Sequence, residues 1–207
     1  IALVGGKEKE RAVLRRLAHH RQDRNVRTVD EVPPRFPQRH TSTLDERPIV
    51  IGAGCAGLFC ALTLAEAGLS PLLIERGDDA ERRNARVSRF NETGLLDTES
   101  NIQFGLGGAG TFSDGKLQTG TKSPLHRLIL ETFVEAGAPE RILWDAKPHV
   151  GSDILPHVVT NIVHRIEEAG GEVRFRCRLD DIYLAQDGSS SGIHVTQEHE
   201  GIERGED

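Results

Sequence analysis

Three glycines stand at a spacing that can bind phosphate groups. Gly52, Gly54 and Gly57 form a G-x-G-x-x-G pattern between a short apolar run and a segment with helical periodicity. In this pattern the first glycine permits a tight turn, the second lets a pyrophosphate approach the backbone, and the third lets a helix pack closely on a strand. The N–H groups of Cys55 and Ala56 would then face the anion at the positive end of the helix dipole.

An acidic residue stands where such a site requires one. Glu75 ends a second apolar run, residues 71–75, and lies 18 residues after Gly57. A carboxylate there can accept hydrogen bonds from the adenosine ribose hydroxyls and would repel a 2′-phosphate. The spacing therefore predicts a dinucleotide site with Glu75 and Arg76 at its ribose end, and it disfavours NADP. The alternative is an accidental glycine turn in an ordinary strand–helix–strand unit.

A second glycine-rich run, residues 104–116, follows about 30 residues later. Its glycines alternate with Phe104, Leu106 and Phe112, which a mere linker would not need. Backbone N–H groups in such a loop can reach ligand oxygens. We expect this loop to hold the ribityl chain and ring of a flavin, although a flexible connector remains the alternative. The candidate contacts are Gly107, Gly108, Gly110, Thr111, Ser113, Asp114 and Lys116.

The first motif by itself does not distinguish FAD from NAD, and the second loop favours FAD. The predicted function is therefore the FAD-binding portion of an oxidoreductase, in which the flavin ring carries out hydride or electron transfer. NAD(P)H is a candidate electron donor. A non-catalytic remnant and an NAD-dependent dehydrogenase are the two alternatives, and the sequence identifies neither the substrate nor the electron acceptor.

The elements around the first motif follow the order strand, helix, strand. Residues 48–53 are typical of a strand buried on both faces of a parallel sheet, residues 55–67 of a helix, and residues 71–75 of the next parallel strand. This order predicts an α/β fold of the Rossmann type with a right-handed crossover and, further along, a β-meander. Further helices are expected at residues 80–90, 125–137 and 154–169, a strand at 172–178, and a polar hairpin at 182–196.

The predicted domains follow changes in composition. Residues 1–32, with a helix over 7–21 and a strand over 25–32, are expected to be the tail of another α/β domain. Residues 33–47 contain Pro33, Pro34 and Pro37 and are expected to form a linker. Residues 48–186 form the predicted FAD-binding domain, in part, and residues 187–207 a polar hairpin or tail.

Composition by itself favours few classes of protein. The 207 residues carry a net charge of −6 and contain no run of the ~20 apolar residues that a membrane helix requires. We expect no membrane span and no nucleic-acid partner. Cys55, Cys60 and Cys177 are an odd number of cysteines without metal-ligand spacing, so we expect buried thiols and a reducing, cytoplasmic location. The histidines are not grouped with carboxylates as metal ligands would be.

Three blocks of the chain closely resemble a known family: IGAGCAGLFCALTLAEAGLSPLLIERG, RRNARVSRFNETGLLDTESNIQFGLGGAGTFSDGKL and KPHVGSDILPHVVTNIVHRIEEAGGEVRF. Together they resemble the uncharacterised FAD-dependent dehydrogenases of the glutathione-reductase-like flavoprotein superfamily, which bind two dinucleotides. The resemblance implies a bacterial, cytoplasmic FAD protein of roughly 500 residues with a further substrate domain.

This sequence departs from the family in two ways. Leu106 stands where the family loop is expected to carry a carboxylate, and the later strand and turn that complete the family's FAD domain are absent. The resemblance therefore implies a fragment. We expect it to bind FAD weakly, to lack NAD(P)H oxidase activity by itself, and to self-associate through its incomplete sheet.

Overall fold

The structure, a computed structural model, describes residues 6–19, 34–38, 46–112, 115–117 and 123–198. The chain divides into two compact units, residues 1–34 and residues 35–207. In the first unit, helix α1 spans Gly6–His19, close to the helix predicted over residues 7–21. The strand predicted over residues 25–32 and part of the predicted linker lie outside the described residues.

The second unit is built on a parallel sheet. Strands β1 (Ile49–Ile51), β2 (Leu72–Ile74) and β3 (Glu172–Arg174) lie in the order β1-β2-β3. Both pairs are parallel, with Val50 opposite Leu73 and Leu73 opposite Val173. Helix α2 (Cys55–Glu66) connects β1 to β2. The predicted Rossmann-like strand–helix–strand unit is confirmed.

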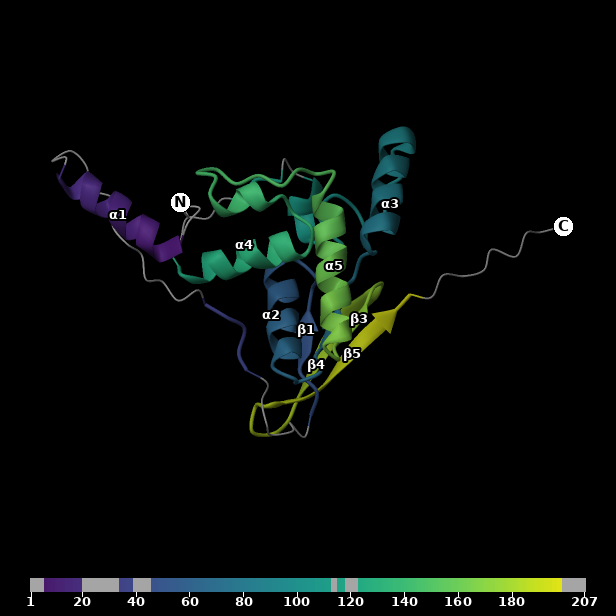
Figure 1. Ribbon diagram of the computed structural model, residues 1–207. Coiled ribbons are helices and arrows are strands. Elements are labelled where there is room, and N and C mark those ends of the chain that lie inside the picture. Colours follow the sequence, from purple (N-terminus) through teal and green to yellow (C-terminus); the bar gives the residue numbers. More distant parts are fainter. Residues whose placement is uncertain (1–5, 20–33, 39–45, 113–114, 118–122, 199–207) are drawn as a thin grey trace. The chain divides into compact units, whose positions relative to one another are not determined.

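The connection from β2 to β3 contains the other helices. It passes through α3 (Ala80–Thr93), the 3-10 turn η1 (Gly108–Phe112), α4 (Leu125–Glu135), η2 (Glu140–Leu143) and α5 (Leu155–Glu168). Helices α2 and α5 contact each other and lie together in front of the sheet in Figure 1. The helices predicted from periodicity are thus present, and α3 extends to Thr93, beyond the predicted end at residue 90.

The hydrophobic core lies between the sheet and these two helices. Val50 and Leu73 from the strands pack with Leu62 of α2 and with Val158 and Ile162 of α5. Burying one such aliphatic side chain contributes about 1.5–3 kcal/mol. The core therefore anchors α2, whose first residue stands directly after the glycine motif.

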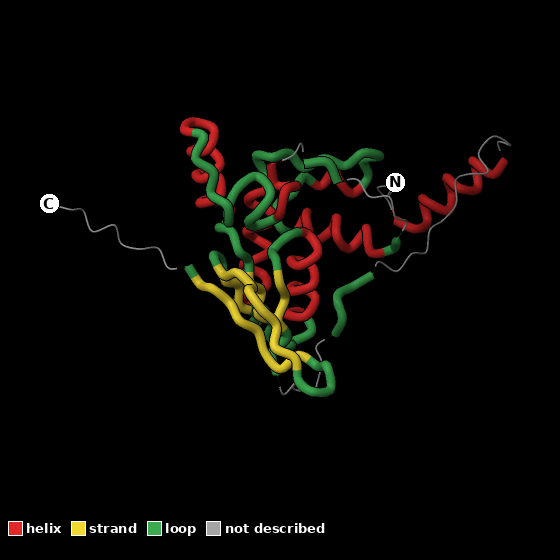
Figure 2. The backbone as a smooth tube through the Cα atoms, turned by 180° about the vertical axis from the view of Figure 1, so that it is seen from behind, coloured by secondary structure: helices red, strands yellow, loops and turns green. Residues whose placement is uncertain are grey.

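An antiparallel hairpin follows the sheet. Strands β4 (Cys177–Leu184) and β5 (Ser190–Gln197) pair with each other, and in Figure 2, seen from behind, the strands lie in front of the helices. The single strand predicted over residues 172–178 is wrong. It is divided at Arg176, which adopts a φ of 52° and turns the chain from β3 into β4.

The prediction that residues 48–53 form a strand buried on both faces is also wrong. Val50 is 8% exposed, but Ile49 and Ile51 are 42% and 49% exposed. Strand β1 stands at the edge of the described sheet, and the helices cover only the face that carries Val50. The apolar composition of β1 indicates that the strand can be buried. Whether both of its faces are buried depends on which elements pack against them.

The cysteines correct a further expectation. All three are free, but only Cys177 is buried, while Cys55 and Cys60 are exposed. Cys55 is the first residue of α2, and Cys60 lies away from the face of α2 that buries Leu58 and Leu62. Local helix geometry therefore decides their exposure.

No helix in the described part of the chain is long and apolar enough to cross a membrane. The same residues contain no group of histidine, cysteine or acidic side chains arranged to hold a metal ion.

Candidate functional site: two glycine loops at the start of helix α2

The first glycine loop has the geometry that its sequence predicts. Gly52 adopts a φ of 90°, which L residues rarely tolerate, and its N–H donates to the carbonyl oxygen of Ile74 at 2.7 Å. A Cβ on Gly57 would collide with the Gly52 carbonyl oxygen, so this glycine permits the close approach of α2 and β1. A Cβ on Gly54 would meet nothing within 4 Å. The loop is tightly packed on one side and open above Gly54.

The N-terminus of α2 faces this open space. Gly54 is the N-cap residue, and no side chain caps the helix. Cys55 and Ala56 are exposed, and the first backbone bond of the helix runs from the N–H of Leu58 to Gly54 O, at 2.9 Å. A helix leaves its first N–H groups without intrahelical acceptors, which makes this end suited to an anion.

Glu75 lies beside the same loop and makes two bonds that the sequence analysis missed. Its side chain accepts hydrogen bonds from the N–H of Ala53 at 2.7 Å and from the N–H of Gly77 at 2.8 Å. The residue is 5% exposed. A carboxylate has about four acceptor positions, so two remain for further donors. Ribose binding by Glu75 stays a prediction, with a structural role added to it.

The second glycine loop packs directly on the first. The N–H of Gly107 donates to the carbonyl oxygen of Ala53 at 2.8 Å. A Cβ on Gly108 would stand 3.6 Å from the Cα of Gly54. Thr111 is buried, and its hydroxyl donates to Leu106 O at 3.2 Å, within the loop itself. The fold therefore joins two segments that are about fifty residues apart in the sequence.

Arg83 holds the second loop from behind, and the sequence analysis did not single it out. Its guanidinium donates to the backbone carbonyls of Asn101, Ile102, Leu106 and Gly108 at 2.7–2.9 Å. A signal was available in the sequence. Ala80, Arg83 and Val87 share the buried face of α3 at helical spacing, so Arg83 stands at a core position.

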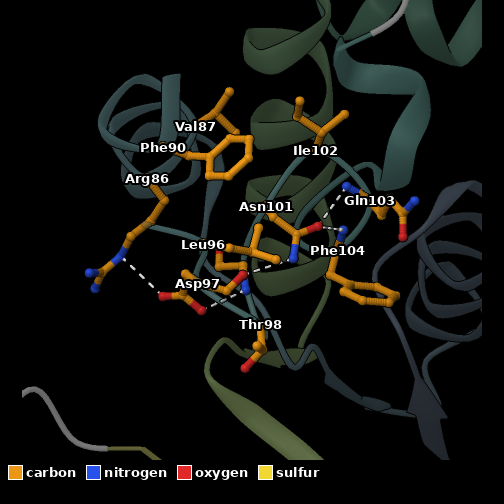
Figure 3. Close-up of a pocket in the computed structure, with 11 residues that line it drawn as sticks. Arg86, Val87, Phe90, Leu96, Asp97, Thr98, Asn101, Ile102, Gln103 and Phe104 are labelled. Atoms are coloured by element: carbon orange, nitrogen blue, oxygen red, sulfur yellow. Dashed lines mark hydrogen bonds and ion pairs between the residues drawn. The ribbon is translucent and has the colours of Figure 1, made fainter. Parts of the chain in front are cut away.

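Side-chain hydrogen bonds shape the segment before this loop, as Figure 3 shows. Asn101 accepts hydrogen bonds from the N–H of Gln103 at 2.9 Å and of Phe104 at 3.3 Å, and its amide donates to Asp97 O at 2.8 Å. A cavity of about 420 Å³ lies on this side, with Phe90 and Leu96 among its walls. These bonds fix the direction in which the chain enters the glycine loop.

Arg76 contacts this segment as well. It pairs with Glu99 at 2.8 Å, and its guanidinium carbon lies 4.5 Å from the centre of the Phe104 ring. The side chain is thus held by protein groups next to Glu75, and a contact with a ligand stays a prediction.

A second cavity, of about 570 Å³, opens beside the two glycine loops. Cys55, Gly107 and Gly110 form its edge towards the loops, and apolar side chains of α2, α4 and α5 form its interior, among them Phe59, Ile129, Leu130, Phe133 and Val159. Gly115 and Lys116 also line it, and Lys116 forms a β-bridge with His149. Ser113 and Asp114 lie outside the described residues.

A cluster of charged residues joins the hairpin to the end of the parallel sheet, close to Glu75 in the sequence. Arg176 pairs with Asp78 at 2.8 Å and with Asp97 at 2.6 Å. Burial raises the pKa of Asp97, but hydrogen bonds from Arg176 and from the N–H groups of Glu99 and Ser100 outweigh burial and lower that pKa to about 2. The cluster holds the start of β4 against the end of β2.

These features together form an open glycine cradle, a helix N-terminus, a buried carboxylate and an apolar cavity. Part of the chain that carries these features matches a family of known proteins. Residues 48–140 match the family of FAD dependent oxidoreductases, DAO. The matched segment includes both glycine loops and Glu75.

The chain is 42% identical over 188 residues to an uncharacterised protein of Clostridium beijerinckii; the match covers 91% of this chain and 34% of that protein. The chain thus spans about a third of the length of this curated relative. A 42-residue segment is 52% identical to a probable electron transfer flavoprotein-quinone oxidoreductase of Escherichia coli, covering 20% of this chain and 10% of that protein. Among solved structures, Thermovibrio ammonificans THI4 is similar with a TM-score of 0.45 and 19% identity, covering 73% of this chain and 47% of THI4.

The geometry of these residues is compatible with a flavin dinucleotide. The open space above Gly54 is where a pyrophosphate would contact the helix N-terminus, and a Cβ on Gly110 would likewise meet nothing within 4 Å. The apolar cavity adjoins both loops and offers room for a ring system.

Proposed function

We propose that this chain is the FAD-binding part of a flavin-dependent oxidoreductase. The observation that carries the proposal is the hydrogen bond from Gly107 to Ala53, because it holds the second glycine loop against the glycine turn that precedes α2. An ADP half alone requires only the first loop and Glu75. The second loop, with the apolar cavity beside it, supplies a place for the ribityl chain and the ring.

Each group of residues has a role in this proposal. The N–H groups of Cys55 and Ala56 hold the diphosphate at the helix N-terminus. Glu75 accepts a hydrogen bond from the adenosine ribose while it keeps the first loop in place. Gly107, Gly108 and Gly110 let the backbone approach the ribityl chain, and Lys116 lines the cavity at this end. Thr111 keeps the shape of the second loop through its bond to Leu106 O. Asp114, Ser113 and Arg76 complete the candidate set. When bound, the flavin supplies hydride or electron transfer.

Calorimetric titration of the chain with FAD, ADP and NADH tests the proposal. We expect binding of FAD and of ADP, with FAD the tighter ligand because only FAD also uses the second loop and the cavity. NADH binding tighter than FAD binding would instead favour an NAD-dependent dehydrogenase. A folded chain that binds none of the three ligands would contradict the proposal and favour a non-catalytic protein.

A matched pair of variants locates the ring end of the ligand. Leu130→Trp adds bulk inside the 570 Å³ cavity, whereas Leu96→Trp adds the same bulk at the other cavity. We expect Leu130→Trp to weaken FAD binding and to leave ADP binding unchanged, and Leu96→Trp to change neither. Equal FAD affinity in both variants would place the ring outside the larger cavity.

A further inference from the structure

Arg83 is a buried cation in a position where helix α3 would ordinarily carry an apolar residue. It is 0% exposed, and it shares its face of the helix with Ala80 and Val87. Burying a charged group is costly unless hydrogen bonds or opposite charges compensate it. The groups around Arg83 must therefore compensate the cost of burying its guanidinium.

Four backbone carbonyls provide part of the compensation. Nη1 donates to Leu106 O at 2.7 Å and to Gly108 O at 2.8 Å. Nε and Nη2 donate to Asn101 O and Ile102 O, each at 2.9 Å. The guanidinium carbon also lies 4.6 Å from the centre of the Phe112 ring. The side chain thus draws the carbonyls of the second loop towards itself and fixes the shape of that loop.

Gly105 is part of the same arrangement. It adopts a φ of 120°, and a Cβ there would stand 2.5 Å from Cδ of Arg83. The loop and the arginine therefore fit each other closely, and a larger residue at either place would separate them.

The charge itself is only partly balanced. All four hydrogen-bond acceptors are neutral carbonyls. Burial lowers the pKa of Arg83 to about 10, and Glu75 opposes this shift through space. Arg83 is therefore positively charged at neutral pH, and the acidic group that acts on it also accepts hydrogen bonds from the first loop.

The loop that Arg83 holds leads directly to the anion-binding end of α2. Gly108, whose carbonyl accepts from Arg83, packs against Gly54, the N-cap of that helix. Salt screens a buried positive charge much less than an exposed one, so the charge of Arg83 can act on an anion near this end of the helix.

We propose that Arg83 is a positioning residue for an anionic ligand: it shapes the second glycine loop and adds a buried positive charge behind the site of the ligand's diphosphate, without touching the ligand. This inference rests on the proposed function, since it requires a diphosphate at the N-terminus of α2. Under this inference, Arg83, a residue outside the glycine motif, contributes to recognition of the charge of the diphosphate.

The test compares ADP with adenosine as probes, because the two share the base and the ribose but only ADP carries the diphosphate. Calorimetric affinities are measured for the unaltered chain, Arg83→Lys, Arg83→Met and a control, Arg89→Met. Arg89 lies on the same helix and is exposed, so the control removes one positive charge from the surface of α3.

We expect Arg83→Met to lower ADP affinity by about tenfold or more and to leave adenosine affinity within about twofold. Arg83→Lys keeps the charge and should retain most of the preference for ADP, even if the thermal midpoint falls. Arg89→Met should behave as the unaltered chain. Equal losses for ADP and adenosine in Arg83→Met would show a merely structural role and overturn the inference, and so would an unchanged ADP affinity.

A measurement on the unaltered chain decides the matter if Arg83→Met does not fold. The Nε–H resonance of Arg83, assigned through its contact with the Phe112 ring, should shift when ADP is added and not when adenosine is added. No shift with ADP, or the same shift with both probes, would overturn the inference. If the unaltered chain binds neither ADP nor FAD, the proposed function itself fails. If the chain binds ADP and substitution of Arg83 leaves the affinity unchanged, only the role of Arg83 fails.

Discussion

Ala53 accepts a hydrogen bond of 2.8 Å from the N–H of Gly107, and its own N–H donates to the Glu75 carboxylate at 2.7 Å. One residue of the first glycine loop is thus held by the second loop on one side and by the end of β2 on the other. These two bonds are buried inside the site, so loss of either partner should change the shape of the loop that faces the ligand.

Substitutions at Gly54 and Gly57 should separate binding from folding. Gly54 has open space at its Cβ and a φ of −71°, so Gly54→Val should fold normally and lose FAD binding, because its side chain occupies the pyrophosphate position. Gly57→Ala places a Cβ against the Gly52 carbonyl oxygen and should destabilise the fold by about 1–3 kcal/mol. Circular dichroism and FAD titration of both variants measure the two effects. Retained FAD binding in folded Gly54→Val would show that the phosphates bind elsewhere.

Substitution of Glu75 should affect both binding and stability. Glu75→Ala removes the acceptor of two backbone N–H groups and the predicted ribose contact. We expect FAD affinity to fall by about 1–3 kcal/mol and the thermal midpoint to fall as well, because two buried donors lose their partner. Glu75→Gln should also destabilise the chain, since its NH₂ group would face an N–H donor. An unchanged dissociation constant for FAD in folded Glu75→Ala would remove this residue from the site.

Acid should weaken the attachment of the hairpin. The pKa of Asp97 is lowered from 3.8 to about 2, so its ion pair with Arg176 stabilises the folded state above pH 4, and this stability is lost as the pH falls towards 2. We expect a contribution of about 1 kcal/mol after allowance for solvent screening. Thermal midpoints of the unaltered chain and of Asp97→Asn, measured from pH 7 to pH 2, should converge in the acid range. A constant difference across that range would exclude this role for Asp97.

The edge of the sheet should promote self-association. Strand β1 pairs only with β2 among the described strands, and it exposes nearly half of the surface of Ile49 and Ile51. An unpaired strand edge beside apolar side chains is a site for pairing with another chain. Sedimentation velocity should show concentration-dependent association that Ile51→Lys reduces. Trp144→Lys replaces a residue that is 66% exposed elsewhere and serves as the control. Equal effects of the two substitutions would locate the association outside β1.

The sequence by itself determined the strand–helix–strand unit and the steric roles of its glycines. These features depend on local requirements: Gly52 needs a positive φ, Gly57 needs space next to the preceding strand, and apolar residues at helical spacing bury one face of α2. Such requirements are visible in neighbouring residues, so periodicity and spacing were sufficient to predict them. The boundaries of α2, α4 and α5 agree with prediction to within about two residues for the same reason.

Only the tertiary structure decided which distant groups meet. The bond between Gly107 and Ala53, and the carbonyls that surround Arg83, join segments separated by many residues. The exposure of Ile49 and Ile51 depends on which elements cover β1. The composition of the strand does not show which elements these are. Arg83 also resembles the exposed arginines around it in sequence, and its burial follows from the side of α3 that packs against the second loop. Contacts of this kind arise from the packing of whole elements, and a local pattern carries no information about the partner across the contact.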